Sequence, residues 1–171
     1  MAIPKLKIML VNPPNCGRSI PEEEYGITSL KQLFKGEPFS LEVLAGPLRE
    51  HDVLIFDMKC ESEDAFWAEF HHFNPDVVGF TAVTCEANTV IRLAENVKVK
   101  SDATVVIGGN HATYDPEYFN RPTFDYIVIG LGKKSFAELI EKMANGKKPN
   151  GIAGIAKTNP GKPLTYLVRD Y

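Results

Sequence analysis

The stretch LKIMLVN, residues 6–12, is almost continuously apolar and ends at Pro13-Pro14. Four later stretches have the same character: DVLIFDM (52–58), DVVGFTA (76–82), TVVIGGN (104–110) and DYIVIGL (125–131). Strands that are apolar on both faces belong in a parallel sheet that is covered on both sides. The sequence therefore predicts a sheet of five parallel strands.

Helical patterns lie between these runs, and they cover residues 40–50, 62–73, 85–99 and 133–146. Ser62 can cap the second helix, whereas Pro47 predicts a kink or a local break in the first. Alternating strands and helices form right-handed βαβ units. We expect a Rossmann-like (flavodoxin-like), doubly wound α/β domain of three layers, with a short extra edge strand at residues 152–158.

The composition indicates one domain, because 171 residues with 44% hydrophobic content suffice for one ordinary core. A net charge of −3 argues against nucleic acid as a partner, and no apolar run is long enough for a membrane span. Cys16, Cys60 and Cys85 lack the spacing of metal ligands. With no signal-peptide pattern at the N-terminus, we expect a cytoplasmic chain with reduced thiols.

Two segments break the alternation of strands and helices. Residues 15–38 form a long polar connection at the carboxyl edge of the predicted sheet, where open α/β folds bind ligands, and they are a candidate lid. Residues 159–171 have the composition of a linker that buries little. We therefore predict a domain over residues 1–158, followed by a linker.

Small residues gather where the predicted strands end. Gly108 and Gly109 would let a ligand approach the backbone, and Gly130 with Gly132 would do the same at the start of another helix. The stretch TAVT, residues 81–84, offers two hydroxyls at a helix start. Free amides beside glycines predict a large planar or phosphate-bearing ligand across this edge of the sheet.

Each of these features also has a structural interpretation. The glycines can simply close turns, and the hydroxyls of Thr81 and Thr84 can cap a helix. His111 is better explained by a structural hydrogen bond in its loop than by catalysis. The pair His71-His72 fits a helix surface better than a metal site, because no carboxylate or cysteine stands at ligand spacing.

Several enzyme classes are excluded by missing motifs. The chain has no phosphate-binding P-loop motif, no Gly-x-Gly-x-x-Gly after the first strand and no nucleophile elbow. Where receiver domains carry acidic residues, this chain reads NPPN (12–15) and FTAV (80–83). No set of catalytic residues is evident.

Taken together, the stretches KIMLVNPP, PDVVGFTAVTCEANTVIRLAENVK, VVIGGNHATYDPE and FDYIVIGLGKKSFAELI resemble a known domain. They are similar to the N-terminal cobalamin-binding domain of B12-dependent radical SAM enzymes, a group that includes the anaerobic magnesium-protoporphyrin monomethyl ester cyclase and many methyltransferases. The similarity covers about residues 5–157, and the ordered series NPP, PDVVGFT, GGNHAT and the glycine turn after DYIVIG is its most specific part.

The resemblance implies that the corrin ring lies over the carboxyl edge of the sheet while the nucleotide tail enters a crevice. It places three groups of residues near the cofactor: Asn12, Pro13 and Pro14 by the ring; Thr81, Ala82, Val83 and Thr84 along the crevice; and Gly108, Gly109, His111, Ala112, Thr113, Gly130 and Gly132 at the last two strand ends. It implies no catalytic residue and no protein ligand to a metal.

Three departures from related proteins refine this expectation. Methionine-synthase-type domains carry Asp-x-His-x-x-Gly after the first strand, where this chain reads NPPNCGRS, so we expect base-off cobalamin without a histidine ligand. The usual Gly-Glu-Gly-Glu is Gly130-Leu131-Gly132-Lys133 here. The Cys-x-x-x-Cys-x-x-Cys motif is absent, so we expect the [4Fe-4S] cluster and S-adenosylmethionine to belong to a radical SAM domain beyond Tyr171.

Two hypotheses of function follow. The first is a cobalamin-binding module without turnover of its own, which positions the corrinoid for methyl transfer or related cobalt chemistry in the radical SAM domain of the same parent chain. The second is a Rossmann-like interaction or scaffold domain that no longer binds cobalamin, a reading motivated by Leu131 and Lys133. A self-sufficient enzyme would need catalytic residues that the sequence does not show.

Overall fold

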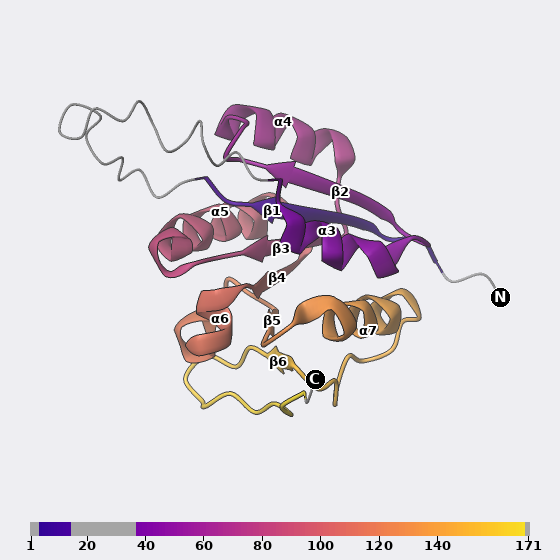
Figure 1. Cartoon of the computed structure of the whole chain (residues 1–171), viewed down its shortest axis with the longest axis vertical. Coiled ribbons are helices and arrows are strands. Elements are labelled where there is room, and N and C mark those ends of the chain that lie inside the picture. The colour runs from indigo at the N-terminus through magenta and orange to yellow at the C-terminus, as the bar shows by residue number, and fades with distance from the viewer. Residues whose placement is uncertain (1–3, 15–36, 170–171) are drawn as a thin grey trace.

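The computed structural model describes residues 4–14 and 37–169. Its centre is a six-stranded sheet in the order β2-β1-β3-β4-β5-β6 (Figure 1). The strands are β1 (Lys7–Asn12), β2 (Asp52–Asp57), β3 (Val77–Thr81), β4 (Thr104–Gly108), β5 (Tyr126–Val128) and β6 (Ile155–Lys157). The first five are parallel and β6 pairs antiparallel with β5, which confirms the predicted Rossmann-like α/β class and its extra edge strand.

The helices follow the predicted order with local differences. They are α3 (Phe39–Ala45), α4 (Glu63–Phe73), α5 (Ala87–Lys100), α6 (Asn110–Tyr114) and α7 (Gly132–Ala144), with 3-10 turns η1 (Gly46–Leu48), η2 (Thr84–Glu86) and η3 (Pro116–Phe119). Pro47 lies in η1, so the expected break in the first helix is confirmed. Ser62 caps α4 by accepting a hydrogen bond from the Ala65 backbone N–H. The short α6 directly after Gly109 was not predicted.

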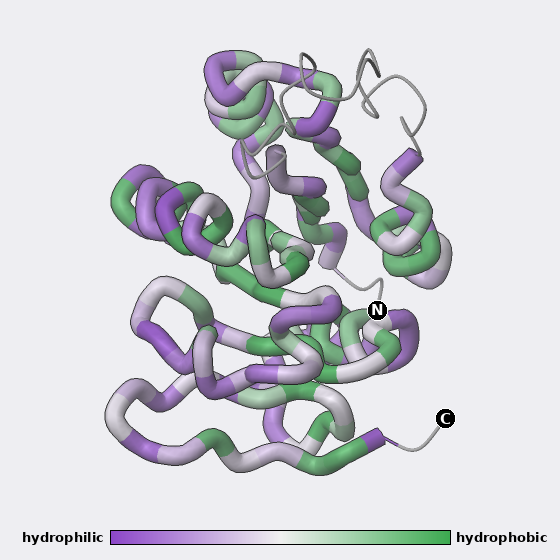
Figure 2. Tube along the Cα trace, turned by 60° about the vertical axis from the view of Figure 1, so that its left-hand side comes forward, coloured by the Kyte–Doolittle hydropathy of each residue, from purple (hydrophilic) through white to green (hydrophobic). Residues whose placement is uncertain are grey.

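Each face of the sheet carries its own hydrophobic core. Helices α3 and α7 cover one face, and α4 and α5 cover the other (Figure 1). Their side chains form two separate clusters with those of the strands. Strand β1 supplies both cores, because Ile8 and Leu10 face α3 and α7 while Met9 and Val11 face α4 and α5. This double burial explains why the strand is continuously apolar, and Figure 2 shows the strands as hydrophobic segments inside a more polar outline.

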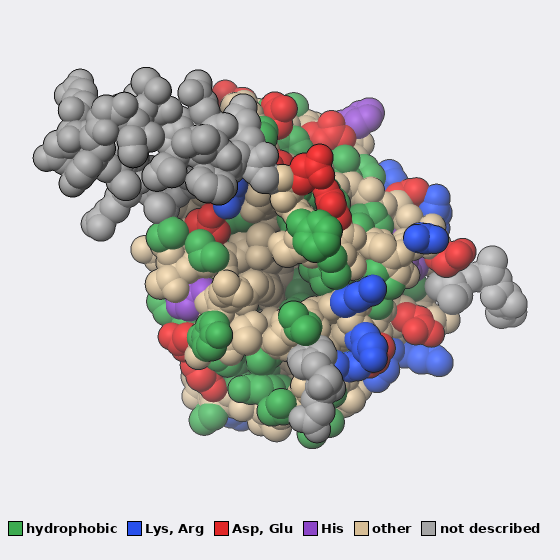
Figure 3. Space-filling model, in the orientation of Figure 1, with side chains coloured by type: hydrophobic (Ala, Val, Ile, Leu, Met, Phe, Trp, Pro, Cys, Tyr) green, Lys and Arg blue, Asp and Glu red, His purple; other side chains and the backbone are tan. Residues whose placement is uncertain are grey.

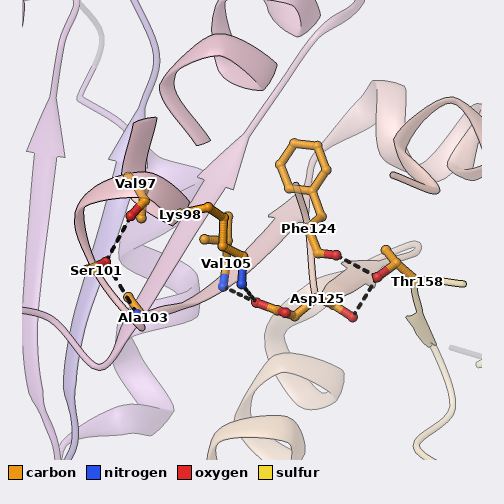
Figure 4. A network of polar contacts seen from close by, with 8 residues as sticks. All are labelled: Val97, Lys98, Ser101, Ala103, Val105, Phe124, Asp125 and Thr158. Carbon is orange, nitrogen blue, oxygen red and sulfur yellow. Dashed lines mark hydrogen bonds and ion pairs between the residues drawn. The ribbon is translucent and has the colours of Figure 1, made fainter. Parts of the chain in front are cut away.

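A polar network joins the last parallel strands to α5 and β6 (Figure 4). The Asp125 carboxylate accepts hydrogen bonds from the Val105 backbone N–H at 2.7 Å and from the Lys98 ammonium. The Thr158 hydroxyl donates to the backbone carbonyl of Phe124. These contacts fix the start of β5 between its two neighbours in the sheet.

The segment after β6, predicted as a linker, runs back along the domain. The Leu164 backbone N–H donates to the Glu117 carboxylate at 2.7 Å, and the Leu167 carbonyl accepts from the Gly154 N–H at 2.7 Å. The Arg169 guanidinium contacts the Ala153 carbonyl at 3.0 Å. Most side chains of this segment remain exposed, and the proposed domain boundary at residue 158 stays a prediction.

The candidate lid, residues 15–38, lies almost entirely outside the described residues. No helix in the described part of the chain is both long and apolar enough to cross a membrane.

Candidate functional site

A cavity of about 720 Å³ opens at the carboxyl edge of the sheet, on the face covered by α3 and α7. Figure 3 shows this face hollowed near its centre. Strands β1, β3, β4 and β5 form its floor, and α3, α6 and the start of α7 form its walls. The residues that line it are Leu10, Ser40, Leu41, Val43, Leu44, Gly79, Phe80, Thr81, Val106, Gly108, Gly109, Asn110, Thr113, Tyr114, Val128, Gly130, Leu131, Gly132, Lys133 and Phe136.

Gly79 lines the cavity and lets the side chains of Leu10 and Phe136 pack closely against β3. A Cβ at this position would lie 2.9 Å from Cδ2 of Leu10 and 3.7 Å from Cζ of Phe136, both of which line the cavity. The sequence analysis did not select Gly79. A glycine inside an apolar strand was nevertheless a usable signal, because it often marks a close approach by a ligand or by another backbone.

Gly109 has a structural role at the edge of the cavity. Its backbone has φ 96° and ψ −175°, which is a region that only glycine enters readily. A Cβ there would lie 2.6 Å from Oγ1 of Thr81 and 2.8 Å from the backbone N and O of Ala82. Gly109 therefore lets the end of β4 pack against the end of β3, in addition to lining the cavity.

Two threonine hydroxyls, those of Thr81 and Thr113, line the cavity, and they differ in whether they already form hydrogen bonds. Oγ1 of Thr113 donates to the Gly109 carbonyl at 2.9 Å and accepts from the Gly130 backbone N–H at 3.1 Å, so it ties the ends of β4 and β5 together. Within the described residues, no hydrogen bond engages the Thr81 hydroxyl. Thr81 is therefore the better placed of the two to contact a ligand in the cavity.

The rim of the cavity combines exposed apolar side chains with one charge. Tyr114 is 88% exposed and Leu131 is 68% exposed, although both line the opening. Among the described lining residues, Lys133 is the one that carries a charge. Helix α7 starts beside it at Gly132, with no side-chain cap and no acidic residue in its first turn.

Some of the predicted cofactor-binding residues line this cavity, namely Thr81, Gly108, Gly109, Thr113, Gly130 and Gly132. The others lie at the same edge of the sheet but not among the lining residues: Asn12, Pro13, Pro14, Ala82, Val83, Thr84, His111 and Ala112.

The local structure gives the reasons for this division. Ala82 and Ala112 are buried in the core on the α4 and α5 face. The Asn12 amide donates to the Asp57 carboxylate at 2.8 Å, so it is engaged at the end of β2. Val83 and Thr84 are exposed where η2 begins. Neighbouring residues at this edge, such as Thr81 and Ala82, therefore lie on opposite sides of the sheet.

The side-chain contacts of His111 and the cap at the start of η2 differ from the expected ones, which were a structural hydrogen bond for His111 and a helix cap by a threonine hydroxyl. The His111 ring stacks on Tyr118 at a centroid distance of 4.8 Å and packs edge-on against Phe119, while its Nδ1 is buried without a hydrogen-bond partner among the described residues. His111 is thus held by aromatic packing of its ring and by the hydrogen bond from its backbone N–H to the Ala82 carbonyl at 3.1 Å. The N–H at the start of η2, on Val83, is capped by the carboxylate of Glu86 at 3.2 Å and not by a threonine hydroxyl.

No metal centre is assembled by the described residues. His71 and His72 are exposed in the last turn of α4, as predicted for a helix surface. A search of the described part of the chain gives no group of three or more His, Cys, Asp or Glu side chains that could hold a metal ion.

Together these features define a doubly wound α/β domain with a largely apolar cavity at the carboxyl edge of its sheet, beside the point where the strand order reverses between β1 and β3. Sequence comparison names the family. The model of the B12 binding domain family matches residues 27–140, and the chain belongs to this family.

Curated relatives agree with this assignment. The chain is 35% identical over 167 residues to an uncharacterised methyltransferase of Pyrococcus horikoshii, covering 92% of this chain and 34% of that protein. It is 27% identical over 165 residues to the anaerobic magnesium-protoporphyrin IX monomethyl ester cyclase of Synechocystis, covering 88% of this chain and 30% of that enzyme. The chain thus spans about a third of the length of these relatives.

Solved structures share the fold. The radical S-adenosylmethionine methyltransferase TsrM from Kitasatospora setae aligns with a TM-score of 0.70 at 22% identity, over 94% of this chain and 30% of TsrM. The cobalamin-dependent S-adenosylmethionine radical enzyme OxsB, with aqua-cobalamin and S-adenosylmethionine bound, aligns with a TM-score of 0.70 at 18% identity, over 98% of this chain and 22% of OxsB.

Proposed function

We propose that this domain binds cobalamin with the corrin ring over the carboxyl edge of the sheet and the nucleotide tail in the cavity. The observation that carries the proposal is the apolar cavity between α3 and α7 in a chain of the B12 binding domain family. The domain would hold the corrinoid for a radical SAM domain of the same parent chain, and it would have no turnover alone.

The cavity fits the nucleotide tail in size and chemistry. Ligand cavities generally measure about 300–1,000 Å³, and this one of about 720 Å³ lies in that range. A benzimidazole base is planar and largely apolar, which suits a floor of Leu10, Val106 and Val128. Gly79 and Gly108 add no side chain of their own to the cavity that they line.

The positions of the histidines support base-off binding without a protein ligand to cobalt. The chain has four histidines, and none of them lines the cavity. His51 accepts a hydrogen bond from the Leu6 backbone N–H at the opposite edge of the sheet, and His111 is packed between aromatic rings. With its own base in the cavity, the cofactor would present a cobalt centre free of imidazole.

The residues of this chain would bind, orient and desolvate the cofactor. When bound, cobalamin would supply the cobalt centre for methyl transfer or related chemistry. Apolar lining side chains would exclude water from the tail, and the Thr81 hydroxyl, which has no hydrogen bond to another described residue, would orient it. The described residues that line the cavity include no carboxylate or histidine that could act as an acid or base, so the chemistry would take place against the radical SAM domain, with its [4Fe-4S] cluster and S-adenosylmethionine.

A titration of the 171-residue chain with hydroxocobalamin and with reduced cobalamin tests this proposal. Visible absorption is recorded, and the protein is then desalted to determine whether corrinoid remains bound. We expect retained corrinoid with a base-off spectrum. A folded protein that retains no corrinoid would contradict the proposal and would favour the interaction or scaffold domain.

A cavity-filling variant makes the test specific to the site. Gly79→Val would place a Cβ 2.9 Å from Cδ2 of Leu10, so Leu10 and Phe136 would have to move. We expect at least about tenfold weaker cobalamin binding and a loss of about 1–3 kcal/mol in unfolding free energy, with the circular dichroism spectrum retained. Gly46→Val is the matched control, because a Cβ on Gly46 meets no atom within 4 Å and Gly46 lies outside the cavity. Equal weakening in both variants would place the corrinoid elsewhere.

A further inference from the structure

Among the described residues that line the cavity, Lys133 is the one with a charged side chain. We propose that Lys133 pairs with the phosphodiester of the nucleotide tail, so that this cavity selects corrinoids with a complete tail over corrinoids that lack it. The inference rests on the proposed function and assigns a role to a residue at which this chain departs from the Glu of the related motif.

Lys133 is available for this role. The ion pairs among the described residues use other cations, namely Lys5, Lys59, Arg92, Lys98 and Arg169. No described acidic residue pairs with Lys133, and none lines the cavity. The side chain is exposed at the rim, so its ammonium group can reach toward a ligand without first breaking an ion pair.

The chemistry of the tail matches this arrangement. The nucleotide tail consists of an apolar base, a neutral ribose and one phosphodiester, which carries its only negative charge. Moving an anion from water to the mouth of an apolar cavity is unfavourable unless a cation is near, whereas the base gains from the apolar interior. A single cation at the rim of an apolar cavity therefore fits a ligand with one anionic group outside an apolar end.

Cobinamide provides the discriminating ligand, because it has the corrin ring but lacks the base, the ribose and the phosphodiester. Contacts to the ring affect cobalamin and cobinamide alike. A contact to the phosphodiester affects cobalamin alone. The change in the ratio of the two dissociation constants between the wild-type chain and a Lys133 variant therefore separates the contribution of Lys133 from general effects on corrin binding.

The experiment measures dissociation constants of both corrinoids for the wild-type chain, Lys133→Ala, Lys133→Glu and Lys134→Glu. Lys134 is the matched control, because it is adjacent and exposed but does not line the cavity. At low salt we expect cobalamin binding to weaken about three- to fivefold in Lys133→Ala and about tenfold or more in Lys133→Glu. Cobinamide binding should change less than about twofold, and 0.5 M NaCl should shrink the effect on cobalamin, since salt screens exposed charges.

The outcomes separate this inference from the proposed function. If the wild-type chain binds neither corrinoid, the proposed function fails and this inference fails with it. If it binds cobalamin but Lys133→Glu binds equally well, or if both corrinoids weaken together, or if Lys134→Glu has the same effect, only the role of Lys133 is overturned. A circular dichroism spectrum of each variant shows that the fold is retained.

Discussion

Replacing Gly109 with alanine should destabilise the domain strongly, although it adds one methyl group. The φ and ψ of Gly109, 96° and −175°, cost an L-residue about 1–3 kcal/mol. The new Cβ would also lie 2.6 Å from Oγ1 of Thr81 and 2.8 Å from backbone atoms of Ala82. These backbone atoms are held in place, because the Ala82 carbonyl accepts from the His111 N–H at 3.1 Å.

Overlap with atoms that have little room to move costs about 1–3 kcal/mol, which gives a total near 4 kcal/mol for Gly109→Ala. Gly108→Ala is the internal control. Gly108 has no positive φ, and its Cβ would lie 3.4 Å from Cβ of Val128, which is an ordinary contact. We expect a loss below about 1 kcal/mol for Gly108→Ala.

Urea unfolding, followed by circular dichroism and by the fluorescence of the single tryptophan, Trp67, measures both variants. For a chain of this length, about 4 kcal/mol corresponds to a decrease in Tm of roughly 8–16 °C. A loss below about 1 kcal/mol for Gly109→Ala, or equal losses at the two positions, would refute the reasoning. A large loss would also show that a bulky residue at position 109 is a poor probe of ligand binding, because it would damage the fold first.

Two further predictions concern polar contacts far from the cavity. Asp125→Ala should cost about 1–3 kcal/mol of unfolding free energy in urea, because it leaves the Val105 N–H and the Lys98 ammonium without their shared acceptor; a loss below about 0.5 kcal/mol would contradict this role. The hydrogen bond from Arg92 lowers the pKa of Glu63 below its ordinary value of 4.5. Unfolded Glu63 therefore binds a proton more readily than folded Glu63, so its stabilisation is present above about pH 4.5 and is lost as the pH falls through the lowered pKa. The difference in unfolding free energy between wild type and Glu63→Gln should stay below about 1 kcal/mol at pH 7, since the Glu63–Arg92 pair is largely exposed. This difference should shrink toward pH 3. A difference that is independent of pH would exclude the ion pair as its source.

The arrangement of layers could be predicted because the burial of a strand on one or both faces determines the pattern of apolar residues along it. Continuous apolar runs such as residues 6–12 occur where both faces of a strand are covered, and Ser62 and Pro47 mark local events that depend only on neighbouring residues. The direction of β6 and the helix α6 could not be predicted in the same way. Three residues show no preference for parallel or antiparallel pairing, and the five residues of α6 are too few for a helical period.

The candidate site was predictable only at the level of the sheet edge. Thr81 and Ala82 are adjacent in the chain, yet one lines the cavity and the other is in the core of the opposite face. Because the faces alternate along a strand, an error of one residue exchanges the ligand side for the core. The wall contributed by Ser40 and Leu44 was missed for a different reason. An amphipathic pattern shows which side of a helix is buried, but it does not show that part of that side borders a cavity.

The antiparallel direction of β6 determines at which edge of the sheet the described part of the chain ends. In a purely parallel arrangement, each helix returns the chain to the amino ends of the strands, and the segment after α7 would lie there. Here β6 runs beside β5 toward the amino edge of the sheet, and the segment after it runs back toward the carboxyl edge. There the Leu167 carbonyl accepts from the Gly154 N–H, and the Arg169 guanidinium donates to the Ala153 carbonyl. Arg169, the last described residue, therefore lies next to the carboxyl end of β5, at the edge where the cavity opens.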